Sequence, residues 1–186
     1  MGGVRRAGVF SALVMDASAL GRESIAGLIR GMPPLVEAYL SLDEQLQPNG
    51  FDLTLREVRR LASAGRLGQA PDQRELSATE ALAFGEDGWV DLAAGPYLVT
   101  FNEIVNLPLN LMALGRPRSS LLRCGVSLHT AVWDAGYRGR SQALLVVHNP
   151  MGYRVQQGAR LMQLVFFRLS QQVADGYQGR FLGENL

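Results

Sequence analysis

The C-terminal third of the chain is divided into short apolar runs, and this pattern constrains the fold most. The runs Ser141–Asn149, Tyr153–Val155 and Leu161–Phe167 are rich in β-branched and aromatic residues. Turn-forming residues separate them, namely Asn149-Pro150, Gly152 and Gly158. Short strands at this spacing predict an all-β sandwich or barrel-like domain.

The segments before these runs carry weaker signals. Ser18 to Gly31 is expected to form a short helix, with Ser18 as its N-cap and Gly31 at its C-terminal end. Pro33-Pro34 then stops any helix. Ser77-Ala78-Thr79-Glu80 has the form of a capping box and predicts one helical turn, and Tyr97 to Leu107 predicts a strand.

Composition excludes several classes of protein. The 186 residues suggest one domain with a real core, and the net charge of +1 argues against a general nucleic-acid or membrane-surface binder. No apolar run is long enough to span a bilayer. Cys124 is the only cysteine, so no intrachain disulfide can form, and we expect it to be buried as a small apolar residue.

Residues 1–17 have the outline of a signal peptide. Arg5-Arg6 precedes an apolar run from Ala7 to Met15, and Ala17-Ser18-Ala19 follows. The run is at the short limit, and Asp16 lies just before the cleavage position. We therefore favour a plain extension over residues 1–17, with Met15 as an alternative start.

Polar chemistry concentrates between Gly115 and Gly139. Arg116-Pro117-Arg118-Ser119-Ser120 places two guanidinium groups and two hydroxyls around a rigid proline, and these donors suit phosphate oxygens. Asp134-Ala135-Gly136-Tyr137-Arg138-Gly139 presents a carboxylate and an aromatic ring on a glycine-flanked turn. Together they suggest a nucleotide site, and the alternative is a charged surface loop followed by a hairpin.

These two clusters resemble the second and third motifs of the dUTPase and dCTP deaminase superfamily, and the chain is most similar to the archaeal-type dUTPases. Gln45 to Leu55 resembles the first motif, Gly158 to Leu164 the fourth and Tyr177 to Glu184 the fifth. The resemblance implies an all-β distorted jelly roll with short N-terminal helices, a β domain over residues 18–176 and a mobile tail over residues 177–186. It also implies a homotrimer with its sites at subunit interfaces, each tail reaching a neighbouring site.

The resemblance also assigns roles to individual residues. Asp134 is expected to activate the attacking water, and Asp52 to help hold a hydrated Mg²⁺ through water. The expected substrate-binding residues are Arg118, Ser119, Ser120 and Gln163 for the phosphates, Thr130 and Ala131 for the base, Tyr137 for the sugar, and Tyr177, Arg180 and Phe181 in the tail. Three plainer alternatives stay open: Asp52 as a solvent-facing strand residue, Gln163 as an ordinary strand residue, and the tail as a frayed end.

One position separates the two activities of the superfamily. Its deaminases carry a glutamate three residues before an asparagine; here Asn149 is the asparagine and Val146 stands in the place of the glutamate. Valine cannot transfer a proton, and no acid lies between Asp134 and Asn149.

The resemblance therefore implies a cytoplasmic enzyme that hydrolyses dUTP to dUMP and pyrophosphate. Its expected partners are dUTP and further copies of the chain, with no nucleic acid and no membrane. A dCTP deaminase-like enzyme and a non-catalytic nucleotide-binding regulator on the same fold are the alternatives.

Overall fold

The structure, a computed structural model, describes residues 18–186. The expected extension over residues 1–17, with its leader-like pattern and alternative start at Met15, lies outside these residues. The helices are α1 (Arg22–Ile29), α2 (Leu42–Gln45), the 3-10 helix η1 (Pro71–Gln73) and α3 (Ser119–Arg123). The strands are β1 (Val36–Glu37), β2 (Leu46–Gln47), β3 (Gly50–Leu61), β4 (Thr79–Ala81), β5 (Trp89–Leu92), β6 (Gly95–Phe101), β7 (Ile104–Asn106), β8 (Leu111–Pro117), β9 (Val126–His129), β10 (Arg138–Gly139), β11 (Gln142–Val147), β12 (Tyr153–Gln156) and β13 (Arg160–Arg168).

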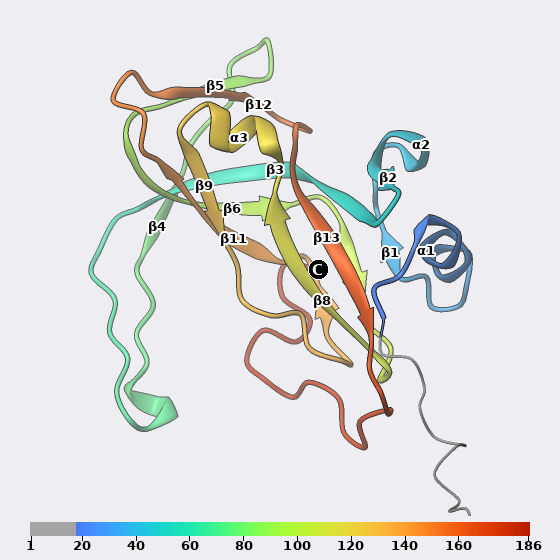
Figure 1. Cartoon of the computed structure of the whole chain (residues 1–186). Coiled ribbons are helices and arrows are strands. Elements are labelled where there is room, and N and C mark those ends of the chain that lie inside the picture. Colours follow the sequence, from blue (N-terminus) through green and yellow to red (C-terminus); the bar gives the residue numbers. More distant parts are fainter. Residues whose placement is uncertain (1–17) are drawn as a thin grey trace, which may run out of the picture.

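One large sheet dominates the molecule, and two small sheets lie at its margins (Figure 1). The strand order of the large sheet is β8-β13-β3-β6-β11-β9, and β2 and β4 also pair with β3. The small sheets are β1-β7-β10 and β12-β5. β3 joins the two halves of the large sheet, because its first residues pair with β13 and its later ones with β6. This all-β arrangement, with α1 and α2 ahead of the long strands, confirms the expected jelly-roll-like fold.

Burial alternates along β11, as in a strand with one face in the core. Along β11, Ala143, Leu145 and Val147 are at most 3% exposed, while the alternate residues are half-buried. β11 pairs on one side with β6 and on the other with β9, so its backbone is satisfied on both edges. The strand after the Asp134 turn is therefore a central one, with one face in the core.

The N-terminal helix begins later than its sequence predicts. α1 has Gly21 as its N-cap, and the proposed cap at Ser18 is wrong. Ser18 accepts a backbone hydrogen bond from Arg168, and Ala19 bridges to Phe167, so this segment extends the sheet instead. Ile25 and Ile29 are buried and Leu28 packs against the core, as the helical face predicts.

Two other local predictions are wrong because tertiary pairing overrides local signals. Ser77 to Glu80 forms no helical turn; β4 starts there and pairs with the end of β3, with Glu80 2.5 Å from Arg60 in an ion pair. The single strand expected from Tyr97 to Leu107 is two strands, β6 and β7. The break at Asn102-Glu103 turns the Glu103 side chain into the core.

Two burial predictions are also wrong. Asp52, for which a solvent-facing strand position was one alternative, is 1% exposed, and the side chains of Arg118 and Arg160 lie against its carboxylate. Cys124 is exposed at the C-cap of α3. None of the helices between residues 18 and 186 has the length and apolar character needed to cross a membrane.

Candidate functional site

The Asp134 turn is shaped by glycine and held from both sides. Tyr137 N donates to Asp134 O at 3.1 Å, and Gly136 has φ of +83°, a conformation that favours glycine. A Cβ on Gly136 would lie 2.6 Å from Cα of Gly176, so the turn and the start of the tail touch here. Asp134 itself is exposed, and its side chain has no hydrogen bond or ion pair within residues 18–186.

The turn is fixed by backbone bonds at both ends, to the large sheet at Trp133 and to the end of β7 at Tyr137. Trp133 and Ala113 exchange two backbone hydrogen bonds, at 2.9 and 3.1 Å, which joins the turn to β8. Leu107 N donates to Tyr137 O at 2.9 Å. The Asp134 carboxylate is therefore presented on a rigid support.

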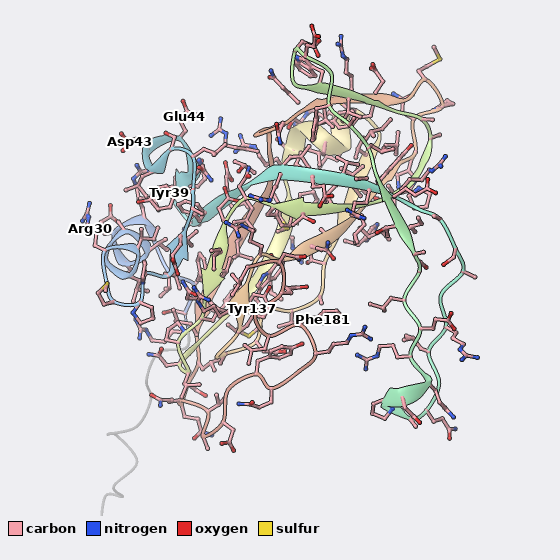
Figure 2. All side chains as sticks on the ribbon, turned by 180° about the vertical axis from the view of Figure 1, so that it is seen from behind. Arg30, Tyr39, Asp43, Glu44, Tyr137 and Phe181 are labelled. Atoms are coloured by element: carbon pink, nitrogen blue, oxygen red, sulfur yellow. The ribbon has the colours of Figure 1, made fainter. Side chains whose placement is uncertain are left out.

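A cavity of about 300 Å³ lies beside this turn, and the tail forms one of its walls. Five expected site residues line it: Ala131, Asp134, Tyr137, Tyr177 and Phe181. Trp133, Ser141, Gln142 and Glu184 complete most of the rest of the lining. We call this cavity the tail pocket; Figure 2 shows Tyr137 and Phe181 close together in it. The half-buried Thr130 precedes Ala131 and is the next residue along the same loop.

The Tyr137 side chain makes its contacts with the tail and is largely shielded from solvent. Its hydroxyl donates to Glu184 Oε1 at 2.7 Å, and its ring meets the Tyr177 ring edge-on, with centroids 5.9 Å apart. Burial raises the pKa of Tyr137 strongly, and the hydrogen bond to Glu184 raises it further, so the phenol stays protonated. Burial also raises the pKa of Glu184, and the Tyr137 hydrogen bond opposes this shift.

The tail lies along the Asp134 turn of its own chain. Tyr177 N donates to Ala135 O at 2.8 Å, and Arg140 Nη1 donates to Asn185 O at 3.1 Å. Phe181 is 38% exposed at the rim of the tail pocket, and Arg180 is exposed. The mobility of the tail and its reach to a neighbouring subunit stay predictions.

A second group of expected residues surrounds Asp52 on β3. Arg118, the N-cap of α3, forms an ion pair with Asp52 Oδ2, and Arg160 Nη1 lies 3.6 Å from the same oxygen. We call these three residues the arginine cluster. Gln163 lies on β13 directly opposite Asp52 and is half-buried. Ser119 and Ser120 are exposed in the first turn of α3.

The arginine cluster is supported by a buried acid that sequence reasoning missed. Glu103 is 0% exposed and accepts three hydrogen bonds: from Gln45 Nε2 at 2.7 Å, Thr54 Oγ1 at 2.6 Å and Thr54 N at 2.9 Å. Gln45 Nε2 also donates to the backbone oxygen of Asp52 at 2.8 Å. Burial raises the pKa of Glu103, and its three donors oppose this shift.

The residues present do not fit a resident Mg²⁺ site. Within residues 18–186 no group of three or more His, Cys, Asp or Glu side chains could hold a metal ion. One oxygen of Asp52 already faces two guanidinium groups, and the other, Oδ1, is buried without a hydrogen-bond partner. A hydrated ion could approach Asp52 only if the side chains of Arg118 and Arg160 moved away.

The two groups of residues lie well apart within one chain. Ala113 pairs with Trp133, and Arg118 is five positions further along the same extended segment. At the rise of a strand this separates the Asp134 turn from Arg118 by about 16 Å. The Arg118 guanidinium also points towards Asp52 rather than towards the turn.

Three residues of the tail pocket were assigned no role from the sequence: Trp133 and Ser141, which lie outside the motifs, and Glu184, which ends the fifth. Trp133 and Ser141 are each 4% exposed, and among residues 18–186 Trp133 Nε1 finds no hydrogen-bond partner. Glu184 stands near the end of the chain, where its sequence neighbours say nothing of Tyr137. Only the position of Trp133 beside Asp134 could have indicated a role.

Comparisons with known proteins identify the family of this chain. A family model described as dCTP deaminase-like matches residues 19–169. A protein of Methanosarcina mazei is 48% identical over 166 residues, covering 89% of this chain and 97% of that protein. A protein of Archaeoglobus fulgidus is 48% identical over 152 residues, covering 82% and 89%. Both carry the name "Probable deoxyuridine 5'-triphosphate nucleotidohydrolase".

A solved structure supports the fold. The 2'-deoxycytidine 5'-triphosphate deaminase from Agrobacterium tumefaciens aligns with a TM-score of 0.63 at 24% identity, over 82% of this chain and 48% of that one. At this identity the likeness concerns the fold alone. The family model and the relatives show more: the chain belongs to the dCTP deaminase-like family, within the dUTPase and dCTP deaminase superfamily.

Proposed function

We propose that the protein is a dUTP nucleotidohydrolase, which converts dUTP and water to dUMP and pyrophosphate. The observation that carries this proposal is the exposed, unpaired carboxylate of Asp134 on the wall of the tail pocket. The names of the relatives from Methanosarcina mazei and Archaeoglobus fulgidus support it. The deaminase alternative lacks its acid, since β11 runs from Gln142 to Val147 without a carboxylate and holds valine at position 146.

Asp134 is the general base of this reaction. It orients a water molecule and takes its proton as the water oxygen bonds to the α-phosphorus; the bond to the bridging oxygen of pyrophosphate breaks. Arg118, Ser119, Ser120 and Gln163 bind the phosphates and offset the negative charge that builds on oxygen. A free, exposed carboxylate suits this role because it is not committed to another partner.

The tail pocket holds the nucleoside. Backbone groups of Thr130 and Ala131 face the uracil, and the Tyr137 ring packs against the deoxyribose and leaves no room for a 2′-hydroxyl. Phe181 and Tyr177 cover the nucleoside from the tail, and Phe181 already lines the cavity. Arg180, exposed beside Phe181, is the tail residue that can reach a phosphate.

Mg²⁺ would be held by the oxygens of the triphosphate rather than by residues 18–186 of the free protein. It supplies neutralisation of the phosphate charge when bound. This assignment follows from the arginine cluster, where Asp52 is already neutralised. Asp52 holds Arg118 in place, and any contact to the hydrated ion through water requires the arginines to turn towards the phosphates.

The working form is a homotrimer with its sites between subunits. About 16 Å of strand separates Asp134 from Arg118 in one chain, and both must act on the same phosphate chain. The Arg118 of a neighbouring subunit can approach the Asp134 turn in a closed ring, where its own chain's Arg118 cannot. We further propose a cytoplasmic enzyme that acts on the free nucleotide, without nucleic acid or membrane as partner.

A nucleotide panel tests the activity. Purified protein is given dUTP, dCTP, UTP and dTTP with Mg²⁺, and pyrophosphate and ammonia are measured in parallel. We expect pyrophosphate from dUTP and no ammonia from dCTP. Ammonia from dCTP at a rate near that of dUTP hydrolysis would establish the deaminase, and binding of dUTP without product would establish the regulator.

A further inference from the structure

Two backbone hydrogen bonds hold the end of the tail against β10, on either side of Gly139. Gly183 N donates to Arg138 O at 2.7 Å, and Arg140 N donates to Glu184 O at 3.0 Å. These backbone bonds place the Glu184 carboxylate where it accepts the 2.7 Å hydrogen bond from the Tyr137 phenol. The backbone bonds thus fix the position of Glu184, and its carboxylate can then accept the hydrogen bond from Tyr137.

The surroundings of this hydrogen bond fit it closely. A Cβ on Gly139 would lie 2.8 Å from the Tyr137 oxygen and 3.1 Å from Cγ of Glu184, so only glycine leaves room for the two side chains to meet. The buried Ser141 hydroxyl lines the same cavity and lies near the phenol, where it opposes the rise in the pKa of Tyr137. The Tyr177 ring contacts the Tyr137 ring edge-on. The phenol is therefore held at its oxygen and at its ring.

We infer that Glu184 is a positioning residue for sugar selectivity, acting on the nucleotide through the Tyr137 ring. This inference rests on the proposed function. Because the tail occupies the phenol oxygen, Tyr137 can offer only its ring carbons to a nucleoside in the tail pocket. A ring fixed at its oxygen cannot swing aside to admit a 2′-hydroxyl, so closure of the tail and rejection of ribonucleotides are a single event.

Substitution of Glu184 tests this role, with selectivity as the readout. The quantity measured is the ratio of kcat/KM for dUTP to kcat/KM for UTP. Glu184→Ala removes the acceptor, and we expect the ratio to fall about tenfold, the usual effect of a hydrogen bond to a charged group. Glu184→Gln keeps an acceptor oxygen and is expected to hold the ratio within about threefold of wild type. Asp175→Ala, at an exposed acid just before the tail, is the matched control and leaves the ratio unchanged.

A double variant separates action through the phenol from a general effect on the tail. Tyr137→Phe should lower the ratio as Glu184→Ala does, and the double variant should match either single one, because both remove the same bond. Equal losses of kcat/KM for dUTP and UTP in Glu184→Ala would overturn the inference, since Glu184 would then only hold the tail closed. An unchanged ratio would overturn it too.

Binding keeps this test independent of the proposed activity. If the wild-type protein hydrolyses no dUTP, the α,β-imido analogues of dUTP and UTP are compared by calorimetry in the same variants. A tenfold loss of the affinity ratio in Glu184→Ala would support the inference while the proposed hydrolysis failed. An unchanged affinity ratio would overturn the inference whatever the activity.

Discussion

The Asp134 turn and the arginine cluster, both expected to serve one nucleotide, differ in how complete they are within a single chain. The turn faces a cavity that has the tail as one wall. The Asp134 carboxylate is exposed and makes no hydrogen bond or ion pair within residues 18–186. In the arginine cluster, Arg118 and Arg160 are turned inwards onto Asp52. The nucleoside half of the site is thus preformed, whereas the phosphate half holds its charges in internal pairs until a polyanion competes for them.

This difference explains why only one half resembles a binding site in the isolated chain. The tail pocket, whose only acids are Asp134 and Glu184, can remain open at little cost, but two guanidinium groups beside a buried carboxylate pair with it. Substitutions that affect one half of the proposed site and spare the other test this difference.

The largest effect is expected at the free carboxylate. Asp134→Asn keeps the size of the side chain but cannot accept a proton, so kcat for dUTP should fall by about 10²- to 10⁴-fold. Because Asp134 is exposed, the thermal unfolding temperature should stay unchanged. Asp91→Asn, at an exposed acid on β5, is the control for a lost surface charge. Near-normal turnover of Asp134→Asn would remove the residue from this role.

Removal of the tail tests whether the preformed half depends on it. Deletion of Tyr177 to Leu186 takes away one wall of the tail pocket and the partner of the Tyr137 phenol, and turnover should fall about 10²-fold through misplacement of the substrate. Sedimentation should show unchanged assembly, since Tyr177 is the one deleted residue that packs against the hydrophobic core of the described chain. Normal turnover would show that the tail is only a frayed end.

Loss of the Asp52 carboxylate should affect the arginine cluster, and the expected result is a less stable protein. Asp52→Asn leaves two guanidinium groups without their carboxylate, and we expect a loss of about 2 kcal/mol in the free energy of unfolding. The figure is below that of a fully buried pair because Arg118 is partly exposed. Urea unfolding measures it, with Asp87→Asn as control, since the Asp87–Arg154 pair is more than half exposed on both sides. Equal small losses in both variants would contradict the internal pairing.

The smallest effect concerns Glu103 and pH. Burial raises the pKa of Glu103 above 4.5, so the folded state holds this proton more tightly than the unfolded state. Its contribution to stability is full below pH 4.5 and is lost as pH rises through the folded-state pKa. Glu103→Gln should flatten this slope and, because one of its three donors loses an acceptor, lower stability by about 1.5 kcal/mol.

Glu184 contributes a slope of the same sign, because burial raises its pKa as well. Glu184→Gln is therefore the control, measured by urea unfolding over the same pH range. If stability depends on pH in Glu103→Gln as it does in wild type, Glu103 is not the group that titrates.

Sequence alone predicted the parts of the molecule that depend on neighbours along the chain. The short strand within Ser141–Asn149 and the Asp134 turn with Gly136 are local patterns, and the structure forms both. Glu103 was missed because its donors, Gln45 and Thr54, lie about fifty residues away in the sequence, where no local pattern announces them.

The same reason accounts for the other differences. The capping box at Ser77 to Glu80 is a local helix signal, but its pairing partner on β3 decides the outcome. Ser18 could cap a helix, but its backbone oxygen accepts a hydrogen bond from Arg168 N, near the other end of the domain. Glu184 gains its role only when the end of the chain returns to Tyr137.

Asp134 of one chain and Arg118 of a neighbouring chain are proposed to serve the same nucleotide, and mixing two inactive variants tests this arrangement. Asp134→Asn and Arg118→Gln are each purified, unfolded together in equal amounts and refolded, and dUTP hydrolysis is compared with wild type. In randomly mixed trimers about a quarter of the interface sites regain both native residues, so we expect about a quarter of wild-type activity. Mixed oligomers that are confirmed by mass and yet remain inactive would show that both residues must come from one chain. That result would contradict a site shared between subunits.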